Sequence, residues 1–280
     1  MFEFLEAVRQ HAFLRHAIYA GALASVACGV MGTYVVTRRI SYMAGAISHC
    51  VLGGMGAARY LEIVRGWEWL SPLHGAVVAA LGAAIIIGLV RLRAREREDT
   101  VIAAVWAIGM AAGVLFISRT PGYGEDLMSY LFGNILMVSA RDLWLIGALD
   151  ALVVAVGLLF YNELQGVCFD EEFARLRGLR VEAYYLMLLC LTALTVVLLV
   201  TVVGIVMVLA LLTIPAAIAG RFTKRLSTMM AASTVVCLGL TTAGLALSYS
   251  LDLPAGATII VLAGGVYIVV VLVSRLVRAW

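Results

Sequence analysis

Residues 184–220 run without a single charged side chain. About 20 apolar residues are enough for one helix to cross the hydrocarbon core of a membrane, so this stretch is too long for one crossing. It must turn back or break inside the membrane, and Gly204 is the natural hinge because glycine tolerates unusual backbone angles. The chain is therefore expected to be an integral membrane protein.

Composition supports a polytopic membrane protein. Of the 280 residues, 64% are hydrophobic and only 13% charged, whereas soluble domains have about 45–50% apolar residues. The net charge of +3 arises from 20 basic and 17 acidic residues, with no block of charge that would indicate a nucleic-acid partner. The five cysteines form neither a disulfide framework nor a CxxC zinc motif.

Apolar windows long enough to span recur along the whole chain. They cover about residues 17–36, 42–62, 73–92, 101–118, 143–161, 184–203, 205–220, 228–249 and 256–277. We therefore predict an all-α fold of eight to nine transmembrane helices in a single domain, residues 1–280. The count is nine if the chain turns back at Gly204, and eight if Gly204 only breaks one helix.

The basic residues predict orientation, because short cytoplasmic loops are rich in Lys and Arg. Under the nine-span count one face collects Arg38, Arg39, Arg91, Arg93, Arg95, Arg97, Arg175, Arg177, Arg180, Arg221, Lys224, Arg225, Arg275 and Arg278. That face is expected to be cytoplasmic, with the C-terminus inside and the N-terminus outside. The predicted location is the cell (inner) membrane, as a multi-pass protein.

Three segments do not read as simple spans. Residues 1–16 are expected to form an interfacial amphipathic helix with Phe2, Leu5, Val8 and Phe13 toward lipid. Residues 125–138 continue from an outer loop with an apolar tail too short to cross, which indicates a re-entrant or interfacial helix. Residues 162–182 predict a cytoplasmic amphipathic helix with Phe169, Phe173 and Leu176 on one face and Asp170, Glu171 and Glu172 near its N-terminus.

His49 and Asp150 are the candidate metal ligands, because an ionisable side chain at membrane depth is expensive to keep without a role. Neutral imidazole binds zinc and related divalent metals. Two simpler readings stay open: His49 packs between helices, and Asp150 pairs with Arg59 or bonds locally. For the outer acids Glu62, Glu68, Glu125 and Asp126, a solvated loop is favoured over a cation-attracting mouth.

The absence of several sequence motifs argues against some classes of protein. The sequence has no GxxxxGK[ST] phosphate loop, and Lys224 is its only lysine, so the chain does not bind ATP in the P-loop manner. It also lacks HExxH and GxSxG, the usual marks of hydrolases. A transport subunit, not an enzyme, is the expected class.

Several motifs, in order along nearly the whole chain, carry a family resemblance. They are Arg38-Arg39 followed by AISH at 46–49, Val51-Leu52 and Gly54, then DLMSYLFGN at 126–134, FDEEFA at 169–174 with Gly178-Leu179, ALLTIPAA at 210–217 and PAG at 254–256. The chain resembles the permease subunits of metal-ion ABC importers, the zinc and manganese uptake group.

The resemblance implies partners and roles. Two permease copies would pair with a cytoplasmic ABC ATPase dimer that hydrolyses ATP, and an extracytoplasmic binding protein would deliver the metal. The ATPase-coupling residues would be Phe169, Asp170, Glu171, Phe173, Ala174 and Gly178. The family's metal site implies an aspartate and, four residues later, a histidine; here the histidine is His49, but Gly45 stands at the aspartate position.

We therefore predict the permease of a binding-protein-dependent importer of divalent metal, most of all zinc, with manganese or ferrous iron as alternatives. No permanently bound cofactor is expected, since the metal is cargo. Asp150 or another carboxylate replaces the missing ligand, or His49 acts alone with water and backbone carbonyls. A metal-chelate permease and a secondary metal transporter are the rival readings; the latter would show inverted repeats, which we do not find.

Overall fold

The computed structural model describes residues 2–67, 69–93, 98–121, 133, 135 and 138–278. Within these ranges the regular structure is entirely helical. The helices are α1 (Phe2–Gln10), α2 (Ala12–Arg38), α3 (Ser41–Arg65), α4 (Pro72–Arg93), α5 (Glu98–Arg119), α7 (Ala140–Leu159), α8 (Tyr161–Phe169), α9 (Glu171–Leu176), α10 (Val181–Val203), α11 (Ile205–Ala219), α12 (Leu226–Leu251) and α13 (Ala255–Arg278).

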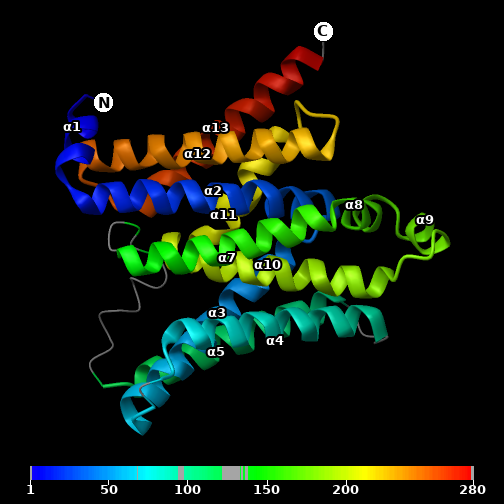
Figure 1. Cartoon of the computed structure of the whole chain (residues 1–280), viewed down its shortest axis with the longest axis horizontal. Coiled ribbons are helices and arrows are strands. Elements are labelled where there is room, and N and C mark those ends of the chain that lie inside the picture. The colour runs from blue at the N-terminus through cyan, green and yellow to red at the C-terminus, as the bar shows by residue number, and fades with distance from the viewer. Residues whose placement is uncertain are drawn as a thin grey trace.

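The long helices run roughly alongside one another as a bundle (Figure 1). Helices α3, α4 and α5 pack together on one side, and α2, α11, α12 and α13 pack together on the other. Helix α10 lies between the two groups, in contact with both α4 and α2. The buried core is correspondingly continuous from Ala17 on α2 to Ile259 on α13.

Seven helices in the described ranges are long and apolar enough to cross a membrane: α2, α4, α5, α7, α10, α12 and α13. Helix α3 has sufficient length but carries many Gly, Ala and Ser residues along with His49, and most of its first half is buried by neighbours. Helix α11 has 15 residues, or about 22 Å at 1.5 Å per residue. Together they account for the nine predicted windows, so the fold class is confirmed.

Gly204 separates α10 from α11, as the sequence predicts. Its φ of 84° and ψ of 162° fall in a region that is essentially restricted to glycine. The chain reverses there, and α11 returns toward the end from which α10 came (Figure 1). The long apolar stretch therefore makes two passes through the bundle.

Small residues bring α3 close to both of its neighbours. A Cβ added to Gly54 would lie 2.1 Å from the Gly75 carbonyl oxygen of α4. A Cβ added to Gly53 would lie 2.7 Å from the Gly109 carbonyl oxygen of α5. Because membrane helices associate through close packing of small residues, these glycines hold the α3–α4–α5 group together.

Replacing Gly54 with leucine is expected to lower stability by about 1–3 kcal/mol, the usual range for overpacking a tight core. The added side chain would meet backbone, which cannot move aside as a flexible side chain can. Thermal unfolding of the detergent-purified chain measures the loss. Gly82→Leu is the control, because a Cβ at Gly82 meets no atom within 4 Å, and an equal loss in both variants would contradict the packing argument.

The described basic residues of the predicted cytoplasmic face lie at one end of the bundle. This end contains the C-terminal ends of α2 and α4, both α8 and α9, the α11–α12 connection and the end of α13 (Figure 1). The N-terminus lies at the other end and the C-terminus at this one, as an odd number of crossings requires. At the opposite end, Trp67 and Trp69 stack with ring centroids 6.1 Å apart.

Boundaries differ from the prediction in two places. The N-terminal segment is divided at His11 into α1 and the start of α2, and Val8 packs on the core, whereas Phe13 is exposed. Residues 162–182 form two short helices separated at Asp170, because the Asp170 side chain caps a new helix instead of continuing the first. The predicted re-entrant helix at 125–138 lies almost wholly outside the described residues.

Candidate functional site

His49 lies on α3 where this helix faces α5. Its imidazole stacks on the Trp106 indole, with ring centroids 4.5 Å apart and an interplanar angle of 17°. The next residue, Cys50, donates a hydrogen bond from Sγ to the Val105 carbonyl oxygen at 3.1 Å. Both contacts hold this part of α3 against α5 and orient the His49 ring.

The His49 Nδ1 atom is buried and has no hydrogen-bond partner among the described residues. The ring as a whole is half-buried. An unmade hydrogen bond at a buried polar group costs about 1–3 kcal/mol, so packing alone is a poor explanation for a histidine here. A ring nitrogen with a free lone pair can bind a cation, and a ring N–H can donate a hydrogen bond to water.

Gly45, one turn before His49, packs closely against side chains of α5 and α11. A Cβ at this position would lie 2.9 Å from Leu209 Cδ1 of α11 and 3.5 Å from Trp106 Cζ3. The Gly45 carbonyl oxygen accepts a hydrogen bond from Ser48 Oγ at 2.8 Å. The space beside His49 on this face of α3 is therefore occupied by an indole ring and a leucine side chain.

Asp150 lies elsewhere in the bundle. It is 6% exposed on α7, which packs on α2, α8 and α10, and its Oδ1 has no hydrogen-bond partner in the described part of the chain. Its predicted alternative partner, Arg59, donates from Nη1 to Glu62 on its own helix at 2.9 Å. The structure thus places His49 and Asp150 on helices that do not pack extensively against each other.

Within the described ranges, no three His, Cys, Asp or Glu side chains come together in a way that could hold a metal ion. Of the outer acids, Glu62 pairs with Arg59, and Glu68, Glu125 and Asp126 lie outside the described residues. The five cysteines are all free. Around His49, ligands for an ion would therefore be the imidazole, water and backbone oxygens.

The second candidate element is α9 at the basic end of the bundle. Asp170 caps it, accepting a hydrogen bond on Oδ1 from the Phe173 backbone N–H at 2.9 Å. Ala174, within α9, is buried. Gly178 lies two residues after the end of the helix and has a φ of 81°. The short helix is thus held at both ends by local backbone chemistry.

The outer surface of α9 is apolar and exposed. Phe169, Phe173 and Leu176 are 65%, 55% and 86% exposed, so the predicted shared face is present although α8 contributes Phe169. Arg177 lies over the Phe173 ring at 5.5 Å. The exposed face lies at the end of the bundle that carries the basic residues, the end that the sequence predicts to be cytoplasmic.

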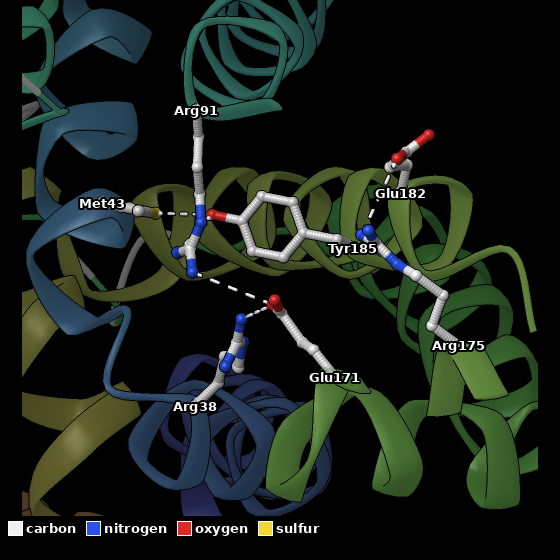
Figure 2. A network of polar contacts seen from close by, with 7 residues as sticks. All are labelled: Arg38, Met43, Arg91, Glu171, Arg175, Glu182 and Tyr185. Carbon is white, nitrogen blue, oxygen red and sulfur yellow. Dashed lines mark hydrogen bonds and ion pairs between the residues drawn. The ribbon is translucent and has the colours of Figure 1, made fainter. Parts of the chain in front are cut away.

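Glu171 joins α9 to the bundle through two arginines (Figure 2). Its carboxylate pairs with Arg38 at the end of α2 and lies 3.9 Å from Arg91 near the end of α4. Arg91 Nη1 donates to the Tyr185 hydroxyl of α10 at 3.1 Å, and this hydroxyl donates to Met43 Sδ of α3 at 3.3 Å. The contacts form a continuous chain from α9 to α3.

Sequence reasoning did not find Trp106, Tyr185 or Met43. Each lies in an apolar span, where an aromatic residue or a methionine carries no sign of a polar role. Arg91 was assigned only to the cytoplasmic charge set. A tyrosine close to the cytoplasmic end of a span is a weak signal of this kind, because its hydroxyl needs a partner when buried.

The fold and these two elements define a class: a multi-pass, all-helical membrane protein with a short, exposed helix at the basic end of its bundle. Comparison with known proteins gives the family. Residues 10–274 match the ABC 3 transport family, and the chain belongs to it, as a metal-ion ABC permease.

The names of similar proteins are consistent with this family. A "probable metal transport system membrane protein" of Chlamydia muridarum is 41% identical over 90% of this chain and 86% of its own length. The "manganese transport system membrane protein MntC" of Halalkalibacterium halodurans is 31% identical over 94% of this chain and 88% of its own. The solved "PsaBC from Streptococcus pneumoniae in complex with Fab" superimposes with a TM-score of 0.85 at 29% identity, covering 96% of this chain and 94% of that one.

Proposed function

We propose that this chain is the permease subunit of an ATP-driven importer of divalent transition metal, and that manganese is its cargo. Zinc, the first choice from the sequence, becomes the alternative. Support for manganese comes from the relatives named for it, at 30–33% identity over more than nine tenths of this chain. Imidazole itself does not separate the two, because it suits zinc as well.

The observation that carries the proposal is the His49 Nδ1 atom, which is buried and has no hydrogen-bond partner in the part of the chain that the structure describes. His49 binds the ion transiently, and water and backbone oxygens complete the coordination shell of the ion. One protein ligand gives weak coordination, and weak coordination suits transport because the ion must leave again. Trp106 stacks on one face of the ring, which fixes the ring plane and therefore the directions in which the ring nitrogens can bind an ion.

The proposed assembly contains two copies of this chain, a cytoplasmic ATPase dimer and an extracytoplasmic metal-binding protein. Within the segment Phe169 to Gly178, the exposed apolar side chains form the surface on which the ATPase docks, and Glu171 pairs with the bundle instead. Support comes from the exposure of these apolar side chains and from the place of α9 at the basic end of the bundle. Hydrolysis of ATP occurs in the partner, and the permease supplies the path.

The test is metal accumulation in cells that lack their own uptake systems, with the chain expressed alongside its ATPase and binding protein. A panel of manganese, zinc, ferrous iron, cobalt and nickel is offered as free ions and as chelates. Accumulation of manganese that requires an intact ATPase is the expected result. Uptake by the purified chain alone in liposomes, or uptake of chelates only, would contradict it.

Asp150→Asn is expected to keep uptake within about twofold of wild type, with the same metal preference. The reason is position: Asp150 packs toward α2 rather than α5, and a neutral amide is cheaper than a carboxylate in an apolar surrounding. The same accumulation assay measures the result. Loss of uptake with a changed metal preference would return Asp150 to the ion path and remove His49 as the sole side-chain ligand.

A further inference from the structure

The ion-pair chain beneath α9 suggests how a docked ATPase moves the ion path. Helix α9 contacts the bundle through α8 and α10, and its buried surface is small, centred on Ala174. Ion pairs from two of its side chains connect it to the long helices. Arg175 lies 3.8 Å from Glu182 of α10, and Glu171 pairs with the ends of α2 and α4. A displacement of α9 at its exposed phenylalanines is therefore transmitted to the ends of α2 and α4 through Glu171.

From Glu171 the contacts continue into α3. Arg91 bridges the carboxylate and the Tyr185 hydroxyl, and its guanidinium also lies 4.6 Å from the centre of the Tyr185 ring. Tyr185 is buried at 1% exposure and hydrogen-bonds to Met43. Met43 is also buried and lies on α3 six residues before His49.

Helix α2 offers a parallel connection. Arg38 ends this helix, and Arg39, with a φ of 61°, makes the tight turn into α3. The Arg38 guanidinium lies 5.8 Å from the centre of the Tyr185 ring, so both arginines meet at the same tyrosine (Figure 2). One carboxylate thus holds two positive groups beside a tyrosine that contacts the start of α3.

We propose that Glu171, Arg91 and Tyr185 form a relay that couples ATPase docking on α9 to movement of α3 at His49. The relay rests on the proposed function, since it assumes that α9 meets the ATPase. Glu171 and Tyr185 are positioning residues: neither touches the ion. Removing the carboxylate leaves two neighbouring guanidinium groups that repel each other, and removing the tyrosine hydroxyl breaks the bond to Met43 without changing the ring's packing.

The experiment measures metal ions transported per ATP hydrolysed, with the full complex of permease, ATPase and binding protein in proteoliposomes. Glu171→Gln and Tyr185→Phe are each expected to retain the ATPase on purification and to lower this ratio about fivefold or more. The double variant is expected to lose no more than Glu171→Gln alone, since residues along one relay are not additive. Asp99→Asn, which removes an exposed carboxylate at the start of α5 and outside α9, is the control and should leave the ratio unchanged.

An unchanged ratio in Glu171→Gln, or losses in the double variant equal to the product of the single losses, would overturn the relay. Loss of the ATPase from purified Glu171→Gln would also overturn it, by making Glu171 a docking residue. None of these three results contradicts the proposed function. That function fails on a different result, namely a wild-type complex that takes up no metal when ATP is hydrolysed.

Discussion

His49→Ala is expected to reduce metal uptake by more than about tenfold while the transporter complex still assembles. Loss even of an outer-shell partner of a metal ligand costs about 10–100-fold in affinity, and no group of three or more His, Cys, Asp or Glu side chains in the described ranges could hold the ion instead. The alanine also removes the ring that stacks on Trp106. Metal accumulation and co-purification of the ATPase are measured on the same cells.

Two further variants separate coordination from packing. His74→Ala is the control, since His74 is exposed at the start of α4 and its Nδ1 is engaged with Ser71. His49→Phe keeps an aromatic ring for Trp106 to stack on, but has no ligand nitrogen. If His49→Phe takes up metal like wild type, the histidine is only a packing residue and the site proposal is wrong.

Replacing Phe169 and Phe173 together with alanine is expected to release the ATPase from the permease, with a loss of affinity of about a hundredfold or more. Both rings are more than half exposed, and buried aromatic side chains at an interface centre contribute about 2 kcal/mol or more each. The measurement is ATPase binding to the purified permease by pull-down and titration. Uptake should fall in parallel, because a permease without its ATPase is not driven.

The matched control for this pair is Trp69→Ala. Trp69 is also a large aromatic side chain, 71% exposed, but it lies at the opposite end of the bundle. It should leave ATPase binding unchanged. If the double alanine variant still binds the ATPase with wild-type affinity, α9 is not the docking surface, and the relay through Glu171 would have no input.

Much of the fold could be predicted from the sequence because membrane insertion depends on hydrophobicity summed along a continuous segment. Each of the nine predicted windows corresponds to a helix, with ends that shift by a few residues, as at 143–161 against Ala140–Leu159. The turn at Gly204 follows from the same argument, since an uncharged segment of that length cannot cross once. The split of residues 162–182 was missed because a single side-chain cap at Asp170 competes locally with helix continuation.

Only part of the candidate site could be predicted from the sequence. His49 stands out in a sequence because a titratable group inside an apolar span is costly, and the exposed face of α9 follows from the spacing of its apolar residues. Asp150 stands out for the same reason as His49, yet nothing in the spacing of the two reveals whether their helices are neighbours. The structure places them against α5 and α2 respectively.

The sequence by itself determined the class of protein, the approximate extents of the apolar helices with their number left at eight to nine, the end that carries positive charge and the residues worth testing. Tertiary structure alone decided that Trp106 and Leu209 fill the space beside Gly45, and that Glu171, Arg91, Tyr185 and Met43 meet. The physical reason is that hydropathy and capping act between residues close in the chain. Contacts such as Arg91 with Tyr185 join residues far apart in sequence, and only the packing of whole helices brings them within reach.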